Sequence, residues 1–146
     1  MNAVRRIRTE AGLTQGQLAA RSGVAQPNIA AYESGARRPS KAMLDRLAKA
    51  AAPLPHELLA DRRLDLLRIA ARYRVEGVRV FGSAARGTDT PDSDVDLLVK
   101  VPANAGMMTV AAFALEIEDL LGVPVDVVSE AALAREHRIR REAVAL

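Results

Sequence analysis

The chain has 146 residues, of which 49% are hydrophobic and 3% aromatic, and it carries a net charge of +3 with no cysteine. The lack of cysteine excludes a disulfide framework and a thiolate metal site. No apolar run approaches the roughly 20 residues of a membrane span, and the N-terminal sequence lacks the apolar core of a signal peptide. We therefore expect a soluble cytoplasmic protein with no membrane partner.

Charge is unevenly distributed along the chain. Residues 1–60 hold 9 Lys and Arg against 4 Asp and Glu, whereas residues 61–146 hold 12 against 14. A basic first part and a mildly acidic second part indicate two domains with different partners. We predict a boundary after residue 60, with an all-α domain before it and a small α/β domain after it.

Four short helices are predicted in the first domain from apolar spacing and capping signals. Thr14, followed three residues later by Gln17, forms a capping-box pattern, and Ser40 can cap the fourth helix. Two helices joined by a tight glycine-containing turn in a basic unit indicate a helix-turn-helix bundle. The predicted helices cover residues 4–11, 15–22, 26–33 and 41–51.

The segment LTQGQLAARSGVAQPNIAAYESGARRPS resembles the Xre/Cro family of phage-repressor-like DNA-binding domains over roughly residues 2–60. The residues that carry the resemblance are Leu13, Gln15, Leu18, Ala19, Gly23, Val24, Gln26, Ile29, Tyr32, Glu33, Gly35 and Pro39. The resemblance implies a structural ion pair between Arg8 and Glu33. It also implies a core that contains Leu18, Ala19, Val24 and Ile29.

The same resemblance implies a DNA-contacting surface. Gln15 would meet a phosphate at the start of its helix. Gln26 and Asn28 would begin the recognition helix, where amide side chains can pair with an adenine edge. Arg37 and Arg38 would contact the DNA backbone beyond that helix. Because such domains usually bind two half-sites of double-stranded DNA as dimers, we expect a homo-oligomer.

The DNA-binding interpretation meets one unusual feature and has one alternative. Pro27 and Ala31 depart from the polar residues usual at base-reading positions, which reduces the possible base contacts. A helical protein-interaction module, whose charges are only solvated, is the alternative for this domain.

Strands alternate with helices in the second domain. Short Val-rich runs indicate buried strands, and longer segments show helical spacing. This order predicts an α/β domain with a short mixed sheet. The predicted strands cover residues 78–81, 95–101 and 123–128, and the predicted helices cover 56–74, 107–121 and 131–143.

A Gly82-Ser83 pair is separated by ten residues from Asp94-Val95-Asp96. Residues two apart on a strand point to the same face, so the two carboxylates converge. Mg²⁺ is typically held by one or two carboxylates together with substrate phosphates. Because Gly82 has no side chain, the backbone can approach a phosphate there, and Ser83 can donate a hydrogen bond to it. These features predict a nucleotide and metal site.

The strand VRVF before this Gly-Ser pair, the spacer and the Asp-x-Asp motif resemble the minimal nucleotidyltransferase branch of the polymerase-beta-like superfamily, over residues 64–146. The resemblance implies that Asp94, Asp96 and Asp126 bind two Mg²⁺ ions. It implies that Asp126 also activates the attacking hydroxyl. The phosphates of an ATP substrate would be held by Gly82, Ser83 and Arg86.

The remaining histidines, aspartates and methionines suggest no further site. His56 and His137 have no companions at ligand spacing, and we expect both to be ordinary surface or helix residues. Asp89, in the spacer, has the sequence context of a common turn aspartate. Met107 and Met108 are expected to fill the core.

Proteins with this domain and of this size resemble the antitoxins of HEPN/MNT toxin–antitoxin pairs. That resemblance implies AMP transfer from ATP to a hydroxyl of a HEPN-type toxin, with DNA-binding autoregulation at the chain's own operator. Two alternatives stay open. One is a non-enzymatic transcription regulator whose second domain only senses nucleotide or dimerises. The other is a nucleotidyltransferase that acts on RNA ends or on a small molecule.

Overall fold

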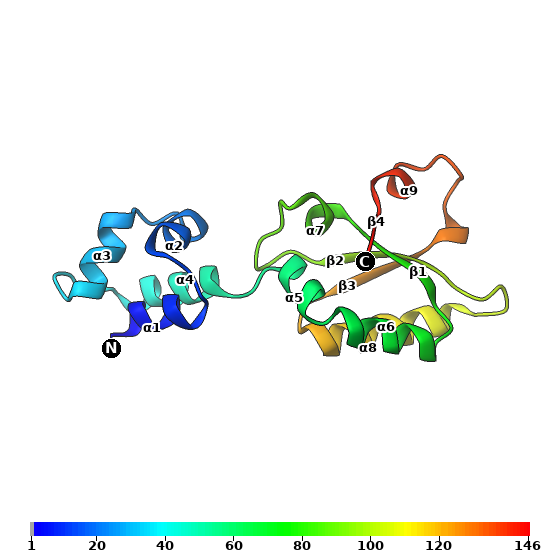
Figure 1. The fold of residues 1–146 in the computed structure, drawn as a ribbon, viewed down its shortest axis with the longest axis horizontal. Helices are drawn as coiled ribbons and strands as arrows, with labels where there is room; N and C mark the ends of the chain where they lie inside the picture. Colours follow the sequence, from blue (N-terminus) through cyan, green and yellow to red (C-terminus); the bar gives the residue numbers. More distant parts are fainter. Residues whose placement is uncertain (1) are drawn as a thin grey trace. The chain divides into compact units, whose positions relative to one another are not determined.

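The computed structural model describes residues 2–146, which form two compact units, one ending at Pro53 and the other spanning Leu54–Leu146. Figure 1 shows the elements of both. The sequence-based boundary after residue 60 falls inside helix α5 (Pro55–Asp61). The contacts assign α5 to the second unit, because it packs on three helices of that unit, which are α6 (Arg63–Arg72), α7 (Gly82–Arg86) and α8 (Met107–Leu121).

The first unit consists of the four predicted helices. Thr14 and Gln17 form the predicted capping box, and the Ser40 hydroxyl accepts a hydrogen bond from the backbone of Met43. These caps fix the helix starts, and the apolar residues between them form one core that includes Leu18 and Ile29. The helices are α1 (Ala3–Glu10), α2 (Gln15–Ser22), α3 (Gln26–Ser34) and α4 (Lys41–Ala51).

The second unit is built on a four-stranded sheet of order β3-β2-β1-β4. The pair β2–β3 is parallel, whereas β1 is antiparallel to both β2 and β4. The predicted mixed sheet is therefore confirmed. The strands are β1 (Glu76–Phe81), β2 (Val95–Lys100), β3 (Val125–Ser129) and β4 (Val144–Ala145).

One face of this sheet is the hydrophobic core. Val95, Leu97 and Val99 of β2 are fully buried there. Helices α6 (Arg63–Arg72) and α8 (Met107–Leu121) cover this face (Figure 1). Since side chains alternate along a strand, Asp96 points to the opposite face, away from the core.

Two predicted helices have a different form in the structure. The helix expected over residues 56–74 is split into α5 and α6 at Arg62, whose φ of −103° and ψ of 15° lie outside the helical region. The closing helix expected over residues 131–143 is replaced by the 3-10 turn η1 (Glu130–Ala132), α9 (Arg138–Glu142) and β4.

Long-range contacts explain the second difference. Glu130 is held by Arg79 of β1 at 2.6 Å and by Arg140 at 2.9 Å, and β4 pairs with β1. These contacts override the local helical spacing of the segment.

The Met107–Met108 pair, which was expected to fill the core, lies outside it, because the two residues are 87% and 82% exposed.

No helix within residues 2–146 is both long and apolar enough to cross a membrane.

Candidate active site

The candidate site begins with two aspartates on neighbouring strands. Asp96 of β2 and Asp126 of β3 are direct partners in the parallel register, and Phe81, the last residue of β1, is the partner of Asp96 on the other side. Residues opposite each other in a ladder share a face of the sheet. The strand pairing therefore brings the two carboxylates together, and Asp94 lies immediately before β2.

Gly82 follows β1 and opens the short helix α7 (Gly82–Arg86). Its φ of +73° is in the left-handed region that favours glycine. A Cβ added at Gly82 would lie under 3.0 Å from Oδ2 of Asp96. The carboxylate of Asp96 thus occupies the space that any side chain at this position would need.

Electrostatics at Asp96 match its position between other carboxylates. Burial raises the pKa of Asp96, and the negative charges of Asp126 and Asp94 raise it further, while Arg86 opposes the shift. Asp96 therefore interacts with both of the other predicted acidic residues. A bound cation would relieve this repulsion.

The carboxylates of Asp96 and Asp126 fit a hard divalent ion, and other ligands must complete its coordination shell. Among residues 2–146, no three Asp, Glu, His or Cys side chains are close enough to hold one ion by themselves. Asp96 and Asp126 supply paired carboxylate oxygens, the ligand type that Mg²⁺ prefers, and Mg²⁺ commonly completes its shell with substrate phosphates and water.

The predicted phosphate-binding residues lie next to these carboxylates. In the described chain the Ser83 hydroxyl has no hydrogen-bond partner, while its carbonyl accepts hydrogen bonds from Gly87 and Thr88. Arg86 is half exposed, and its Nη1 atom is 3.9 Å from Glu142 on α9. Ser83 and Arg86 therefore present a hydroxyl and a cation beside Gly82, and their contact with phosphate stays a prediction.

In the first unit the predicted ion pair is confirmed. Nε of Arg8 donates to Glu33 at 2.6 Å, and Nη1 donates to the carbonyl of Leu13 at 2.9 Å. Gln15 also donates from Nε2 to Glu33. Burial alone would raise the pKa of Glu33, but the hydrogen bonds from Arg8 and Gln15 outweigh it and lower that pKa.

The predicted DNA-contacting residues are placed on and after α3. Gln26 and Arg38 are exposed. Arg37 donates to Oδ1 of Asn28 at 3.0 Å, and its guanidinium lies 5.9 Å from the centre of the Tyr32 ring. Arg37 is thus held against α3. The DNA contacts themselves, including the one predicted for Gln15, stay predictions.

Comparison with known families gives a match for each of the two units. Residues 4–52 match the family model described as "Helix-turn-helix". Residues 65–145, more than half of the chain, match the one described as "Nucleotidyltransferase domain". The chain belongs to this nucleotidyltransferase family. Such domains typically use a divalent metal ion and a nucleoside triphosphate.

Two relatives resemble the nucleotidyltransferase part of the chain. A solved structure described as "Structure of putative minimal nucleotidyltransferase" is 44% identical with a TM-score of 0.57, covering 62% of this chain and 95% of that one. "Putative protein adenylyltransferase MJ0128" of Methanocaldococcus jannaschii is 34% identical over 62 residues, 42% of this chain and 63% of the relative. The chain thus spans less than two thirds of that relative's length.

Sequence reasoning missed a buried polar pair in the nucleotidyltransferase domain. The side chain of Asp89 is fully buried and bonds to His56, the second residue of α5, with Nδ1 2.8 Å from Oδ1. Asp89 is therefore no ordinary turn residue, and His56 has a partner. The two lie 33 positions apart, and neither belongs to a spaced motif, so no sequence signal connects them.

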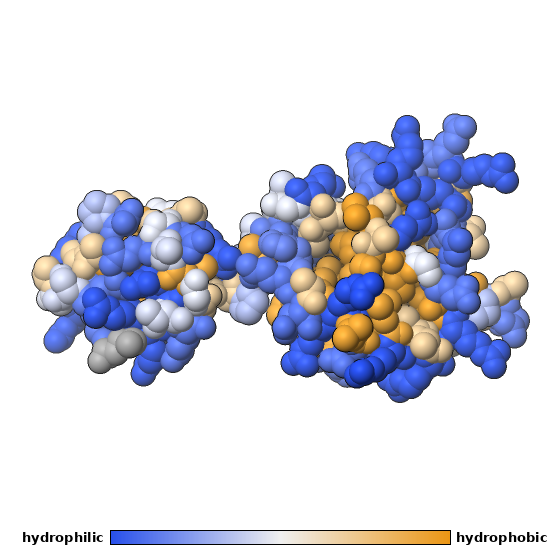
Figure 2. All heavy atoms as spheres, viewed as in Figure 1, coloured by the Kyte–Doolittle hydropathy of each residue, from blue (hydrophilic) through white to orange (hydrophobic). Residues whose placement is uncertain are grey.

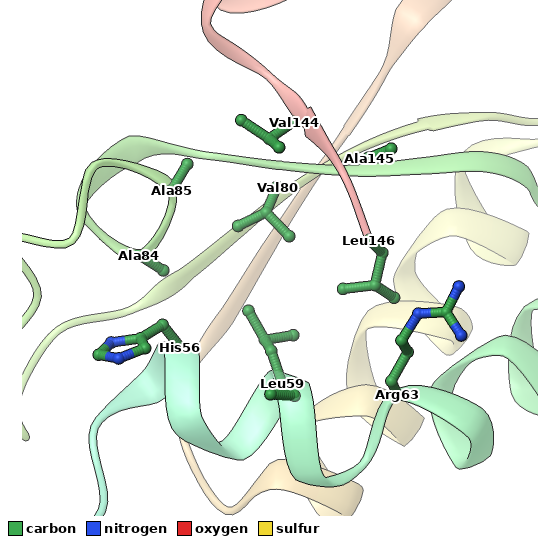
Figure 3. Close-up of a pocket in the computed structure, with 10 residues that line it drawn as sticks. His56, Leu59, Arg63, Val80, Ala84, Ala85, Val144, Ala145 and Leu146 are labelled. Atoms are coloured by element: carbon green, nitrogen blue, oxygen red, sulfur yellow. The ribbon is translucent and has the colours of Figure 1, made fainter.

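A pocket of about 300 Å³ lies beside α7 (Figure 3). Its walls are mostly apolar, with Leu59, Val80, Ala84 and Leu146 among them, and His56 at one end. Apolar side chains also gather on the surface over α5, α6 and β4 in Figure 2. None of the three aspartates lines this pocket, so it is distinct from the candidate active site.

Proposed function

We propose that the protein transfers AMP from ATP to a hydroxyl group of a partner protein, in a reaction that depends on Mg²⁺. The observation that carries the proposal is the placement of Asp96 opposite Asp126, with the carboxylate of Asp96 in the space that Gly82 leaves open. A nucleotidyltransferase needs acidic ligands directly beside a backbone turn that a phosphate can approach, and this arrangement supplies both.

Each residue of the site has a proposed role. Asp94, Asp96 and Asp126 hold the metal, and Gly82, Ser83 and Arg86 hold the phosphates. Two Mg²⁺ ions, when bound, would neutralise the triphosphate and stabilise the attacking and leaving oxygens. The raised pKa of Asp96, caused by burial and by its acidic neighbours, supports this assignment, because such a cluster favours a cation.

The proposed reaction is a single displacement at the α-phosphorus of ATP. The acceptor hydroxyl oxygen forms a bond to the α-phosphorus, and the bond from that phosphorus to the oxygen bridging to the β-phosphorus breaks. Pyrophosphate leaves with the electron pair of the broken bond. Asp126 accepts the hydroxyl proton. It is exposed at the edge of the site, where an acceptor can approach it.

A protein acceptor is supported by a named relative. "Putative protein adenylyltransferase MJ0128" matches this chain at 34% identity over 62 residues. By family resemblance the acceptor is a HEPN-type toxin, which would make this protein its antitoxin. The helix-turn-helix unit would bind double-stranded DNA at the chain's own operator as a homo-oligomer, so that one chain combines toxin modification with autoregulation.

The test is label transfer from [α-³²P]ATP with Mg²⁺ and the product of the adjacent gene. We expect label on that product, lost in Asp94→Asn and Asp96→Asn and retained in Asp119→Asn, which changes an exposed carboxylate of α8. DNA binding, followed by gel shift with the upstream region, should be intact in all variants.

Other outcomes would reject the proposal in favour of a named alternative. Label that appears on added RNA or on a small molecule, and not on protein, would identify a different acceptor class. DNA binding without any transfer that depends on Asp94 and Asp96 would identify a non-enzymatic regulator.

A further inference from the structure

The spacer between Ser83 and Asp94 is fastened to helix α5 by one buried carboxylate. The side chain of Asp89 is 0% exposed, and among residues 2–146 its hydrogen bonds are all made with His56. The backbone N–H of His56 donates to Oδ2 at 2.8 Å, and Nδ1 lies 2.8 Å from Oδ1. A buried carboxylate without such donors would be strongly destabilising, so this pairing fixes the place of Asp89.

The protonation of the pair follows from hydrogen-bond chemistry. An ionised carboxylate only accepts hydrogen bonds, so Nδ1 of His56 carries the hydrogen. Asp89 is therefore tethered by two donors of one residue, the Nδ1–H and the backbone N–H of His56.

The tether is close along the chain to the metal-binding aspartates. Between Asp89 and Asp94 the backbone forms a closed turn. Thr90 N–H donates to the Ser93 hydroxyl at 2.8 Å, and Ser93 N–H donates to the Thr90 carbonyl at 2.9 Å. These two hydrogen bonds link the position of Asp94 to that of Asp89.

Helix α5 provides a firm anchor for this tether. Its start is capped by the side chain of Glu57, which accepts a hydrogen bond from the backbone of Leu54 at 2.8 Å. Leu59 is 4% exposed and belongs to the same core cluster as Ala84 of α7. Figure 3 shows His56 and Leu59 on α5, facing the pocket that Ala84 also lines. The anchor and α7 therefore share one core.

We propose that His56 and Asp89 are positioning residues of the transferase, which hold Asp94 beside Asp96 so that the site binds its metal ion. The inference rests on the proposed function. Neither residue touches the reacting atoms in this assignment. They act through the Thr90–Ser93 turn. Substituting either one should therefore weaken metal binding, although every metal-binding residue of the site is still present.

The experiment compares three substitutions of His56. In His56→Asn the side-chain amide can place an N–H where Nδ1 lies, whereas in His56→Gln the amide reaches the position of Nε2, and His56→Ala has no donor. Binding of Mn²⁺, used as a probe for Mg²⁺, is followed by electron paramagnetic resonance of the free ion. Melting temperature and circular dichroism report on folding.

We expect His56→Ala and His56→Gln to weaken Mn²⁺ binding by about tenfold, the size typical for residues that orient metal ligands. His56→Asn should bind Mn²⁺ with an affinity within about threefold of that of the wild type, because the amide N–H replaces the imidazole N–H imperfectly. In the transfer assay, His56→Ala should lower kcat at saturating ATP, and the Asn variant should restore it. Asp89→Asn, which keeps an acceptor for the backbone N–H of His56, should be intermediate.

Several outcomes would overturn the inference. It fails if His56→Ala lowers the melting temperature but binds Mn²⁺ like the wild type, because the pair would then only stabilise the fold. It also fails if the Asn and Ala variants behave alike. A wild-type protein that binds Mn²⁺ through Asp94 but transfers no label contradicts the proposed function alone, and the Mn²⁺ comparison still decides the role of His56. Absence of Mn²⁺ binding that depends on Asp94 contradicts both.

Discussion

Asp96 and Asp126 are direct partners in the parallel ladder between β2 and β3. The register of two strands thus brings together carboxylates that are 30 positions apart in sequence. Such proximity is unfavourable without a cation, since burial and the charges of Asp126 and Asp94 raise the pKa of Asp96. The fold tolerates this repulsion between carboxylates at the site where the proposed chemistry needs their negative charge.

The first prediction concerns the stability of the metal-free protein. Asp96→Asn removes one charge from the acidic cluster with little change of shape. We expect the free energy of unfolding at neutral pH to rise by about 1 kcal/mol, as is common when a functional site loses its strain. Because a carboxyl with a raised pKa destabilises the folded state once it ionises, the gain should shrink as the pH falls toward the ordinary value for Asp. Urea denaturation at several pH values measures this.

Mg²⁺ provides the second prediction. In the wild type, MgCl₂ with a non-hydrolysable ATP analogue should raise the melting temperature, because a ligand that binds only the folded state stabilises it. In Asp96→Asn this increase should be absent, while Asp119→Asn should keep it. An equal increase in all three proteins would place the metal elsewhere.

Gly82 offers a third prediction with a matched control. Gly82→Ala and Gly122→Ala each introduce a side chain at a φ of +73°, so both carry the same backbone strain. Only the Cβ at position 82 meets Asp96, whereas nothing lies within 4 Å at position 122. We expect both variants to be destabilised by about 1 kcal/mol, and only Gly82→Ala to lose transfer activity, by about 100-fold, since misplacement of about 1 Å has that effect. Comparable activity in the two variants would show that the contact with Asp96 does not matter for transfer.

The fourth prediction concerns Glu33 and pH. Hydrogen bonds from Arg8 and Gln15 lower the pKa of Glu33 below 4.5 despite its burial. A lowered carboxyl pKa stabilises the folded state fully above the unfolded value and loses this effect as the pH falls through the folded value. The stabilisation should therefore be complete above about pH 4.5 and decline below it.

Glu33→Gln tests this pH dependence. The amide nitrogen of the new side chain cannot accept from Arg8 or Gln15, so the variant should lose about 1–3 kcal/mol of stability at pH 7. The difference from the wild type should narrow as the pH is lowered to 3. Glu10→Gln, at an exposed position of α1, should differ little from the wild type throughout. A Glu33→Gln effect that does not change with pH would contradict the assignment.

The fifth prediction concerns DNA binding. Arg38 is exposed, and a side chain that contacts phosphate contributes to affinity for any sequence. Arg38→Ala should weaken binding to specific and unrelated duplexes alike and reduce the slope of log K against log salt by about 1. Fluorescence anisotropy with labelled duplexes measures both. Arg6→Ala, on the exposed side of α1, serves as the control and should leave the slope unchanged.

The local parts of the structure were predictable because their causes are local. The capping box at Thr14 and Gln17 and the cap at Ser40 define helix starts through contacts within four residues. The turn at Gly82 depends on residues close in sequence, whereas the shared face expected for Asp94 and Asp96 stays a prediction, since β2 begins at Val95. The structure of the segment after Glu130 was not predictable, because ion pairs and strand pairing with distant residues decide it.

The sequence by itself determined a helix-turn-helix bundle and an α/β nucleotidyltransferase domain, and it supplied the acidic residues that we propose for the site, since each depends on spacing along one chain. Only the tertiary structure decided that Asp96 faces Asp126, that Gly82 must be glycine and that Asp89 is tethered to His56. The physical reason is that strand register and burial are properties of segments far apart in sequence. Their free energy depends on packing that no local pattern encodes.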